Sequence, residues 1–266
     1  MKRVLCLLAA ALLTGLCQTQ ASAVEIIAHR GASHDAPENT VAAFKLAWEQ
    51  GADGAECDLY LTKDNKIVGF HDKTLKRTAG IDKPISDFTL EELRKLEVGS
   101  WKNEAFRGEK IPTFEELMAA VPQGKKVYIE VKCGPEIVPE LLRQLGTFSH
   151  PPENTPVICF NAKVIAAVKK ARPDLPAYFL HDPKKVTAEE VIAIAREIQA
   201  DGLDLRATPE LDKAYADKVL AAGFRLDVWT VNKPEEAQRV VQLGVKGITT
   251  DRPAFLREAL SAQQSE

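Results

Sequence analysis

Histidine, acidic and basic residues stand at or near the ends of several short apolar segments of this chain. They are His29, Arg30, Glu56, Asp58, His71, Glu130 and Lys132. The guanidinium group of Arg30 offers forked donors to phosphate or carboxylate oxygens, and Gly31 after it would let the backbone approach an anion closely. Imidazole titrates near neutral pH, so His29 and His71 are candidates for general acid and general base. An anion clamp, an acid–base pair and carboxylates for a cation are together the groups that cleavage of a phosphodiester requires.

The acidic residues of this set have the spacing of a metal site. Glu56 and Asp58 are two residues apart on a predicted strand, so both carboxylates point to the same face and repel unless a cation lies between them. Glu130 adds a third carboxylate from another predicted strand, and an all-oxygen site suits Ca2+ or Mg2+ and not Zn2+. The alternative is that Glu130 only forms a structural ion pair with Lys132. We favour the metal-ligand role, because a buried ion pair loses hydration without a clear gain in stability.

The other histidines have no comparable neighbours. A histidine alone is usually a hydrogen-bonded structural residue, whereas His29 and His71 stand beside an arginine and three acids, which favours catalysis. His34, His150 and His181 lack such company in the sequence, and we expect them to be structural or exposed.

Several motifs occur in an order that resembles the glycerophosphodiester phosphodiesterase family. They are His29-Arg30-Gly31, Pro37-Glu38-Asn39-Thr40, Glu56-Cys57-Asp58, His71-Asp72, the segment 111–117, Glu130-Val131-Lys132, Trp229-Thr230-Val231-Asn232 and the segment 247–253. The resemblance spans nearly the whole chain after residue 23. It implies metal-dependent hydrolysis of glycerophosphodiesters to glycerol 3-phosphate and an alcohol.

The resemblance also implies two substrate contacts and shows two departures. It places Lys132 at the phosphate as a second cation and Trp229 on the glycerol side, in agreement with the use of aromatic walls in small-molecule pockets. This chain has Cys159-Phe160 where the family usually has Ser-Phe, and its segment 77–80 lacks an asparagine that the family often carries.

The pattern of apolar segments predicts an α/β fold, a (β/α)8 TIM barrel, in which active sites lie at the carboxyl ends of the strands. We expect strands at 26–28, 54–60, 127–131, 157–160, 177–180, 202–205, 224–231 and 247–249, with helices after Asn39 or Thr40 and at 113–121, 136–146, 162–171, 188–199, 209–222, 234–243 and after 249. On this prediction, each motif falls at the carboxyl end of a strand.

One connection departs from the alternation. Only residues 62–66 separate Leu61 from Ile67, which is too short for a crossover and right for a β-hairpin. We therefore treat 59–71 as an excursion above the carboxyl-end rim that returns His71 to the level of Asp58. Residues 72–110 are expected to form a small insertion with a short helix over Leu90 to Leu96.

The first residues have the pattern of a signal peptide. Lys2 and Arg3 precede an apolar run from Val4 to Leu13, and Ala21-Ser22-Ala23 resembles a cleavage site. We expect residues 1–23 to be removed and residues 24–266 to form a single barrel domain, exported to the periplasm or secreted, with no stable membrane anchor, since the apolar run is too short to span a bilayer.

Composition limits the partners. The formal charge is −3 and the chain has no basic run, so nucleic acid is not an expected partner. Cys57, Cys133 and Cys159 remain after residue 23, an odd number with no zinc-site spacing, and we expect them to be packing residues. The sequence does not predict an oligomeric state.

Two rival functions are weighed against the phosphodiesterase prediction. A lysophospholipase D or sphingomyelinase-D-like enzyme on the same barrel would need an apolar groove for acyl chains. A non-catalytic phosphate-ligand-binding barrel would not need both histidines. The nucleophile, water or the vicinal hydroxyl of the substrate, and the preferred headgroup are left open by the sequence.

Overall fold

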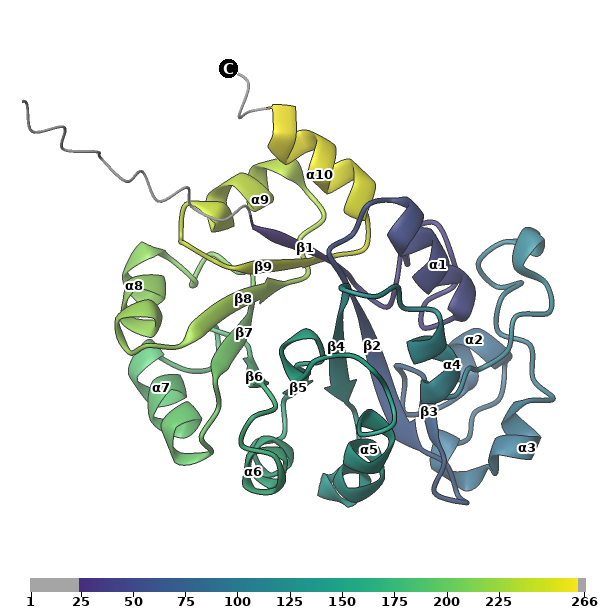
Figure 1. Ribbon diagram of the computed structural model, residues 1–266. Helices are drawn as coiled ribbons and strands as arrows, with labels where there is room; N and C mark the ends of the chain where they lie inside the picture. Colours follow the sequence, from purple (N-terminus) through teal and green to yellow (C-terminus); the bar gives the residue numbers. More distant parts are fainter. Residues whose placement is uncertain (1–23, 263–266) are drawn as a thin grey trace, which may run out of the picture.

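Eight parallel strands close into a ring in the computed structural model, which describes residues 24–262 (Figure 1). They are β1 (Glu25–Ala28), β2 (Gly54–Leu61), β4 (Lys126–Val131), β5 (Val157–Cys159), β6 (Ala177–His181), β7 (Gly202–Arg206), β8 (Arg225–Trp229) and β9 (Gly247–Thr250). The order around the ring is β1-β9-β8-β7-β6-β5-β4-β2, and pairing of Ile27 with Gly54 joins β2 back to β1. The predicted (β/α)8 TIM barrel is confirmed. The predicted signal peptide lies outside the described residues.

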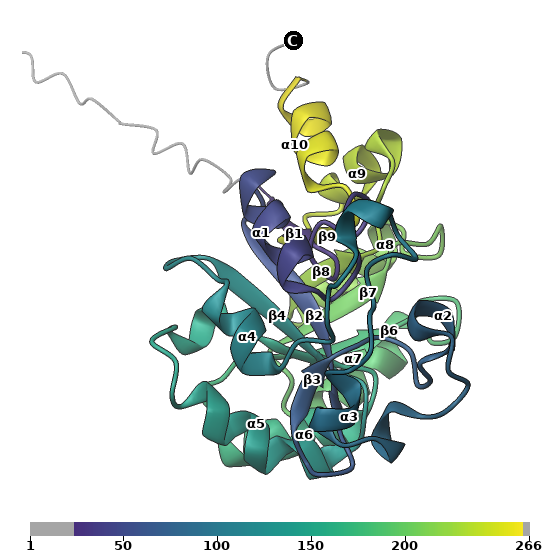
Figure 2. The same ribbon diagram turned by 90° about the vertical axis from the view of Figure 1, so that its right-hand side faces the viewer.

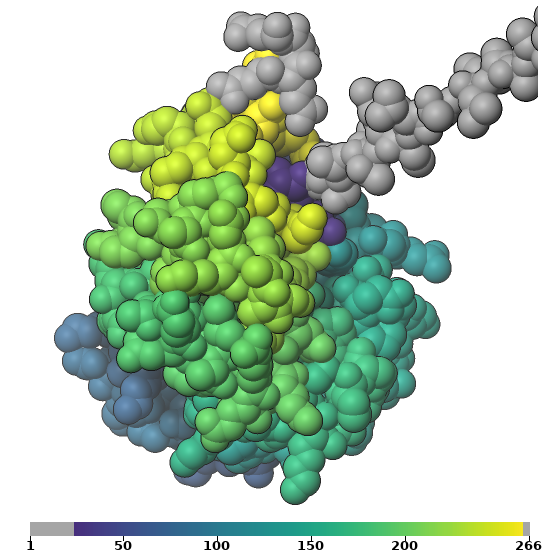
Figure 3. Space-filling model, turned by 90° about the vertical axis from the view of Figure 1, so that its left-hand side faces the viewer, coloured from purple at the N-terminus to yellow at the C-terminus, as the bar shows by residue number. Residues whose placement is uncertain are grey.

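Helices cover the outside of the ring. They are α1 (Val41–Glu49), α4 (Phe114–Ala119), α5 (Val138–Leu145), α6 (Ala162–Ala171), α7 (Ala188–Glu197), α8 (Lys213–Ala221), α9 (Pro234–Val241) and α10 (Pro253–Ala262). Figure 3, which views the side of α7 and α8, shows the closely packed surface that these helices and their neighbours form over the strands. Within residues 24–262, no helix is long and apolar enough to cross a membrane.

Capping residues set where two of the helices begin. The side chain of Thr40 caps α1 by accepting a hydrogen bond from the amide of Ala43. Helix α8 begins at Lys213 and not near residue 209 as predicted, because the carboxylate of Asp212 accepts from the amide of Tyr215 and makes Asp212 the cap.

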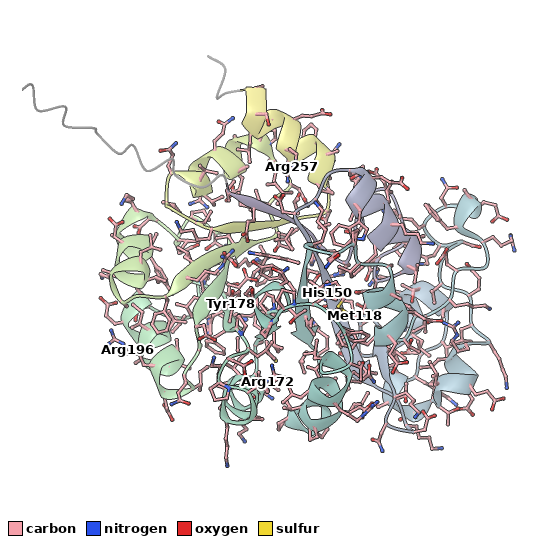
Figure 4. All side chains as sticks on the ribbon, in the orientation of Figure 1. Met118, His150, Arg172, Tyr178, Arg196 and Arg257 are labelled. Carbon is pink, nitrogen blue, oxygen red and sulfur yellow. The ribbon has the colours of Figure 1, made fainter. Side chains whose placement is uncertain are left out.

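Side chains alternate between the two faces of each strand. In β7, Leu203 and Leu205 pack outward in the main apolar core between strands and helices, and Asp204 between them points inward. A small apolar cluster fills part of the interior of the ring, and Trp229 packs against it. Its members are Ile27, Tyr128, Ile158, Tyr178 and Leu180. Tyr178 lies within the ring of strands (Figure 4). Polar side chains lie at the carboxyl end of the interior.

The predicted hairpin stands outside the ring. Strand β3 (Ile67–Gly69) pairs antiparallel with the end of β2, and the amide of Phe70 donates to the carbonyl of Asp58 over 2.9 Å. His71 therefore returns to the level of Asp58, as predicted. The insertion that follows has its own apolar core and carries the short helices α2 (Lys76–Ala79) and α3 (Leu90–Leu93), the latter shorter than predicted (Figure 2).

One motif is misplaced by the prediction. The segment 111–117 does not lie at the carboxyl end of a barrel strand, because Thr113 and Glu116 form a capping box that begins α4. Just before it, the carbonyl of Pro112 accepts from the amide of Gly69. The segment therefore fastens the hairpin to the barrel.

The three cysteines after residue 23 are free, and the prediction that they are packing residues is confirmed. Cys57 and Cys159 are buried in the main core, and Cys133 packs against it. The thiol of Cys159 donates to the carbonyl of Val131 over 3.0 Å. This hydrogen bond joins the neighbouring strands β5 and β4, and a serine hydroxyl could also make it.

Candidate active site

A cavity of about 260 Å3 opens at the carboxyl end of the ring. The predicted site residues His29, Arg30, Glu56, His71, Glu130, Lys132 and Trp229 line it, together with Asp204 and Phe160 among others. Asp58, the remaining predicted residue, lies against Arg30 and Lys132. The structure thus brings all the predicted site residues together.

His29 is held by the carboxylate of Asp251, which directly follows the last strand of the ring. Its Nδ1 lies 2.6 Å from Oδ1 of Asp251, which also accepts from the hydroxyl of Ser33, while Oδ2 of Asp251 accepts from the amide of Asn232. Burial opposes ionisation of Asp251, but the hydrogen bond and charge of His29 outweigh it, and the pKa of Asp251 is below its ordinary value. With Nδ1 occupied, Nε2 of His29 is the ring nitrogen left for a ligand.

His71 is held in the same way by its sequence neighbour. Its Nδ1 lies 2.7 Å from Oδ1 of Asp72, whose other oxygen accepts from Nε of Arg77 over 2.8 Å. Burial opposes ionisation of Asp72, but the hydrogen bonds of Arg77 and His71 lower its pKa to about 2. Burial lowers the pKa of His71 below its ordinary value, which favours the neutral form of its ring.

Glu56, Asp58 and Glu130 form the carboxylate cluster. One oxygen of each lies within 4.8 Å of the others, and all three side chains are buried. Burial and the charges of Asp58 and Glu130 raise the pKa of Glu56 well above its ordinary value. Burial, followed by the charge of Asp58, raises the pKa of Glu130 to about 7.

The cluster fits a hard divalent cation. Within the described part of the chain, Oε1 of Glu56 and Oδ1 of Asp58 are buried without a hydrogen-bond partner. These two oxygens come from β2, and the carboxylate of Glu130 converges on them from β4, which gives the oxygen donor set that Ca2+ or Mg2+ prefers. Glu56, Asp58 and Glu130 are therefore the residues that would hold such an ion.

The two cations of the site are bound to these acids. Nε of Arg30 lies 3.3 Å from Oδ2 of Asp58, and the backbone amide of Arg30 donates to Glu56 over 2.8 Å. Nζ of Lys132 lies 2.7 Å from Glu130 and 3.5 Å from Asp58. The ion pair that the sequence offered as the alternative for Glu130 does exist, alongside the carboxylate cluster.

Trp229 forms one wall of the cavity. Its ring contacts Phe160 edge to face, with the centroids 5.5 Å apart, and its Nε1 donates to the backbone carbonyl of Asp204 over 3.2 Å. Phe160 is 47% exposed, so this aromatic pair reaches the outer surface of the rim.

Several residues of the site were not singled out from the sequence, although most lie in the quoted motifs. Asn39 and Asp58 bond twice, with the amide Nδ2 of Asn39 donating over 2.7 Å and its Oδ1 accepting from the backbone of Asp58 over 3.0 Å. Glu38 accepts from both Arg30 and Arg77. Asp251 lies in the motif 247–253. The presence of these polar residues in motifs was the available signal, but their partners depend on the closed ring.

The remaining histidines lie outside this arrangement. His34 does have an acidic neighbour, contrary to expectation, because its Nδ1 lies 2.7 Å from Oδ1 of Asp35, but this pair is exposed. His181 accepts a hydrogen bond from the amide of Asp182 with its Nδ1. None of His34, His150 and His181 lines the cavity.

Comparison of sequences places the chain in a family. The sequence model of the glycerophosphoryl diester phosphodiesterase family matches residues 29–255. A glycerophosphodiester phosphodiesterase from Caldanaerobacter subterraneus subsp. tengcongensis is 37% identical over 238 residues, which cover 87% of this chain and 95% of that protein. A protein of the same name from Bacillus subtilis is 31% identical over 249 residues, covering 85% of this chain and 83% of that protein.

Comparison of structures agrees. An Oleispira antarctica phosphodiesterase in complex with the product sn-glycerol-3-phosphate superposes with a TM-score of 0.79 at 28% identity, covering 89% of this chain and 96% of that chain. A glycerophosphodiester phosphodiesterase from Thermotoga maritima gives a TM-score of 0.74 at 26% identity, covering 88% and 97%. The chain therefore belongs to the glycerophosphoryl diester phosphodiesterase family and is an enzyme of that kind.

Proposed function

We propose that this protein hydrolyses glycerophosphodiesters to glycerol 3-phosphate and an alcohol in the cavity described above. The main support for this proposal is that two histidines, suited to act as general acid and general base, line the same cavity as the carboxylate cluster. His29 and His71 each have Nδ1 on a carboxylate, so each has Nε2 left to exchange a proton with a substrate in the cavity.

Arg30 and Lys132 bind the phosphate group. Both line the cavity, and each has an acidic partner from which it can turn to phosphate oxygens. A Ca2+ or Mg2+ ion held by Glu56, Asp58 and Glu130 would supply further positive charge at the phosphate as charge develops in the transition state. The all-oxygen donor set suits both ions.

The two histidines transfer different protons, one as general base and the other as general acid. The ring of His71, whose pKa is lowered by burial, suits it to remove a proton from the attacking hydroxyl, which belongs to water or to the glycerol moiety itself. Attack by the glycerol hydroxyl forms a cyclic phosphate, which water opens to glycerol 3-phosphate in a second step. His29 then gives a proton to the oxygen of the leaving alcohol as the phosphorus–oxygen bond breaks. Asp251 holds Nδ1 of His29 at 2.6 Å and so keeps Nε2 directed to the cavity.

The surroundings of the cavity favour a glycerol-binding pocket with a loosely bound alcohol. Trp229 supplies a wall for glycerol, and a wider groove of about 670 Å3 adjoins the cavity through Glu130, Lys132 and Phe160. The lining of this groove is mixed, with polar residues such as Asn65 and Lys73 beside apolar ones such as Leu61. Neither the lysophospholipase D alternative nor a non-catalytic barrel is favoured.

We infer that the enzyme is exported, to the periplasm or the medium, from the pattern of residues 1–23. The mass of the protein recovered outside the cytosol tests this inference, and a chain that keeps Met1 would contradict it.

Release of glycerol 3-phosphate from a panel of glycerophosphodiesters, with and without a chelator, tests the function. We expect release that stops on chelation and returns with Ca2+ or Mg2+. Failure to release glycerol 3-phosphate from any member of the panel, with either ion present, would overturn the proposal.

A further inference from the structure

Asp204 is a cavity residue to which the mechanism above gives no role. It lies in the middle of β7, its side chain is 1% exposed, and it lines the catalytic cavity together with Trp229 and Leu180. Neither of its carboxyl oxygens has a hydrogen-bond partner among residues 24–262. Asp204 is thus a buried polar group with two unsatisfied oxygens at the edge of the space where substrate binds.

The neighbouring strand carries an acid in the same register with the opposite arrangement. Asp227 of β8 pairs with Asp204 in the sheet and is equally buried, at 1% exposure. Its carboxylate accepts from Nε of Arg225 and from the hydroxyl of Tyr128. Asp227 does not line the cavity. The acid that lacks partners is the one that borders the substrate cavity.

A carboxyl group in this position does not stabilise the fold. A buried polar group without a partner is destabilising, and an apolar side chain of similar volume would fill the place at lower free energy. Burial, followed by the charges of Asp227 and Glu130, raises the pKa of Asp204, so the group avoids the still larger penalty of an isolated buried charge. Such a group gains a partner only when something enters the cavity.

The position of Asp204 relative to Trp229 indicates what that partner is. Nε1 of Trp229 donates to the backbone carbonyl of Asp204, which fixes the indole wall to the strand that carries the carboxyl group. Asp204 is not one of the three acids whose oxygens converge within 4.8 Å of one another. A carboxyl group, neutral or charged, accepts a hydrogen bond from a hydroxyl, and the substrate part that carries free hydroxyls is glycerol.

We propose that Asp204 binds a hydroxyl group of the glycerol moiety and so distinguishes glycerophosphodiesters from diesters of simple alcohols. The inference rests on the proposed function and adds a specificity residue to it. Trp229 supplies shape on this side of the pocket, and Asp204 supplies the polar contact. A site that hydrogen-bonds a hydroxyl rejects the analogue that lacks it, because its own polar group is then left unpaired.

Competitive inhibition of the metal-loaded enzyme tests the proposal. The probes are sn-glycerol 3-phosphate and propyl phosphate, which share the phosphate and the three-carbon chain and differ in two hydroxyls. In Asp204→Leu, the inhibition constant of glycerol 3-phosphate should rise about 10- to 100-fold, since a hydrogen bond to a buried acid is lost. That of propyl phosphate should stay within about twofold, because it makes no such bond. Asp204→Asn keeps a hydrogen-bonding group and should retain most of the discrimination.

Stability measurements separate this role from a structural one. The melting temperature of Asp204→Leu should equal or exceed that of the wild type, because an unpartnered carboxyl group has been removed. The matched control is Asp227→Asn, which should lower the melting temperature and leave the ratio of the two inhibition constants within about twofold, since Asp227 does not line the cavity. If Asp204→Leu does not fold, Asp204→Ala carries the same expected loss of discrimination.

Two results would overturn the inference while leaving the proposed function intact. If Asp204→Leu weakens both inhibitors equally, Asp204 supports the phosphate side and not glycerol. If it weakens neither, the carboxyl group is satisfied by water alone. A wild-type enzyme that releases no glycerol 3-phosphate from any glycerophosphodiester would instead overturn the proposed function.

Discussion

Nδ1 of His29 lies 2.6 Å from Oδ1 of Asp251, although the two residues are 222 positions apart in the chain. His29 follows the first strand of the ring and Asp251 follows the last, and pairing of Ala28 with Thr250 brings their ends together. The second histidine has its carboxylate one position away, at Asp72. The two histidine–carboxylate pairs are alike in geometry, but only the first depends on closure of the barrel.

Asp251→Asn should lower kcat on the order of 10- to 100-fold, because it removes the carboxylate that orients the ring of His29 through Nδ1. The variant should also change the pH dependence of stability. The ordinary pKa of Asp251 is 3.8 and that in the folded protein is lower, so its stabilisation is fully present above pH 3.8 and is lost as pH falls further. The difference in melting temperature between wild type and variant should therefore shrink below about pH 4. A difference that grows on acidification would contradict this sign.

His29→Ala and His71→Ala should each lower kcat on the order of 10²–10⁴-fold, because each removes a group that transfers a proton. His34→Ala is the matched control and should be close to neutral, since His34 is exposed and paired only with Asp35. Steady-state kinetics with glycerophosphocholine gives the comparison. Equal losses in all three variants would mean that the histidines act through folding.

Glu56→Gln should abolish activity while the protein stays folded. The substitution replaces one of three crowded acidic groups by a neutral amide and weakens the cation site, so the melting temperature without metal should not fall. Thermal unfolding with and without Ca2+ or Mg2+ measures the second effect, and the ions should stabilise the wild type more than the variant. Full wild-type activity after exhaustive chelation would exclude the metal site.

Arg77→Ala should lower kcat about tenfold, because Arg77 joins Asp72, the partner of His71, to Glu38, the partner of Arg30. Arg107→Ala is the control, since Arg107 is an exposed arginine of the same insertion whose pairing is with Glu104. If the Arg107 variant is impaired as strongly, the insertion as a whole is responsible and not the bridge.

Trp229→Ala should weaken binding of glycerol-containing substrates more than that of bis(p-nitrophenyl) phosphate, because only the former use the wall. In the wild type, glycerophosphocholine, glycerophosphoethanolamine and glycerophosphoglycerol should be cleaved at rates within about tenfold of one another, since the proposed place of the alcohol is a wide groove. A lysophospholipid that outpaces all three would contradict a pocket for glycerol.

The sequence predicts those parts of the structure that follow from local geometry. Alternation of apolar segments predicts the strand count, and the five residues at 62–66 predict a hairpin that returns His71 to the level of Asp58. The partners of site residues depend instead on which strands become neighbours. The contact between Asp251 and His29 does not follow from the sequence alone, because it requires β1 and β9 to be neighbours in the closed ring. Asp204 and Asp227 look alike in sequence, and only their surroundings in the barrel separate a satisfied acid from an unsatisfied one.

The pairing of β1 with both β2 and β9 also constrains how the enzyme folds. Residues 25–28 remain without one of their two sheet neighbours until residues 247–250 are available, so the longest-range contacts of the ring form between its first and last strands. Contacts of large sequence separation are formed slowly and at a high entropic cost. A nascent or shortened chain that ends before Gly247 would leave an edge of β1 open to pairing with other chains and would lack Asp251. We therefore expect activity only in chains that contain residues 247–251, which pair with β1 and hold His29.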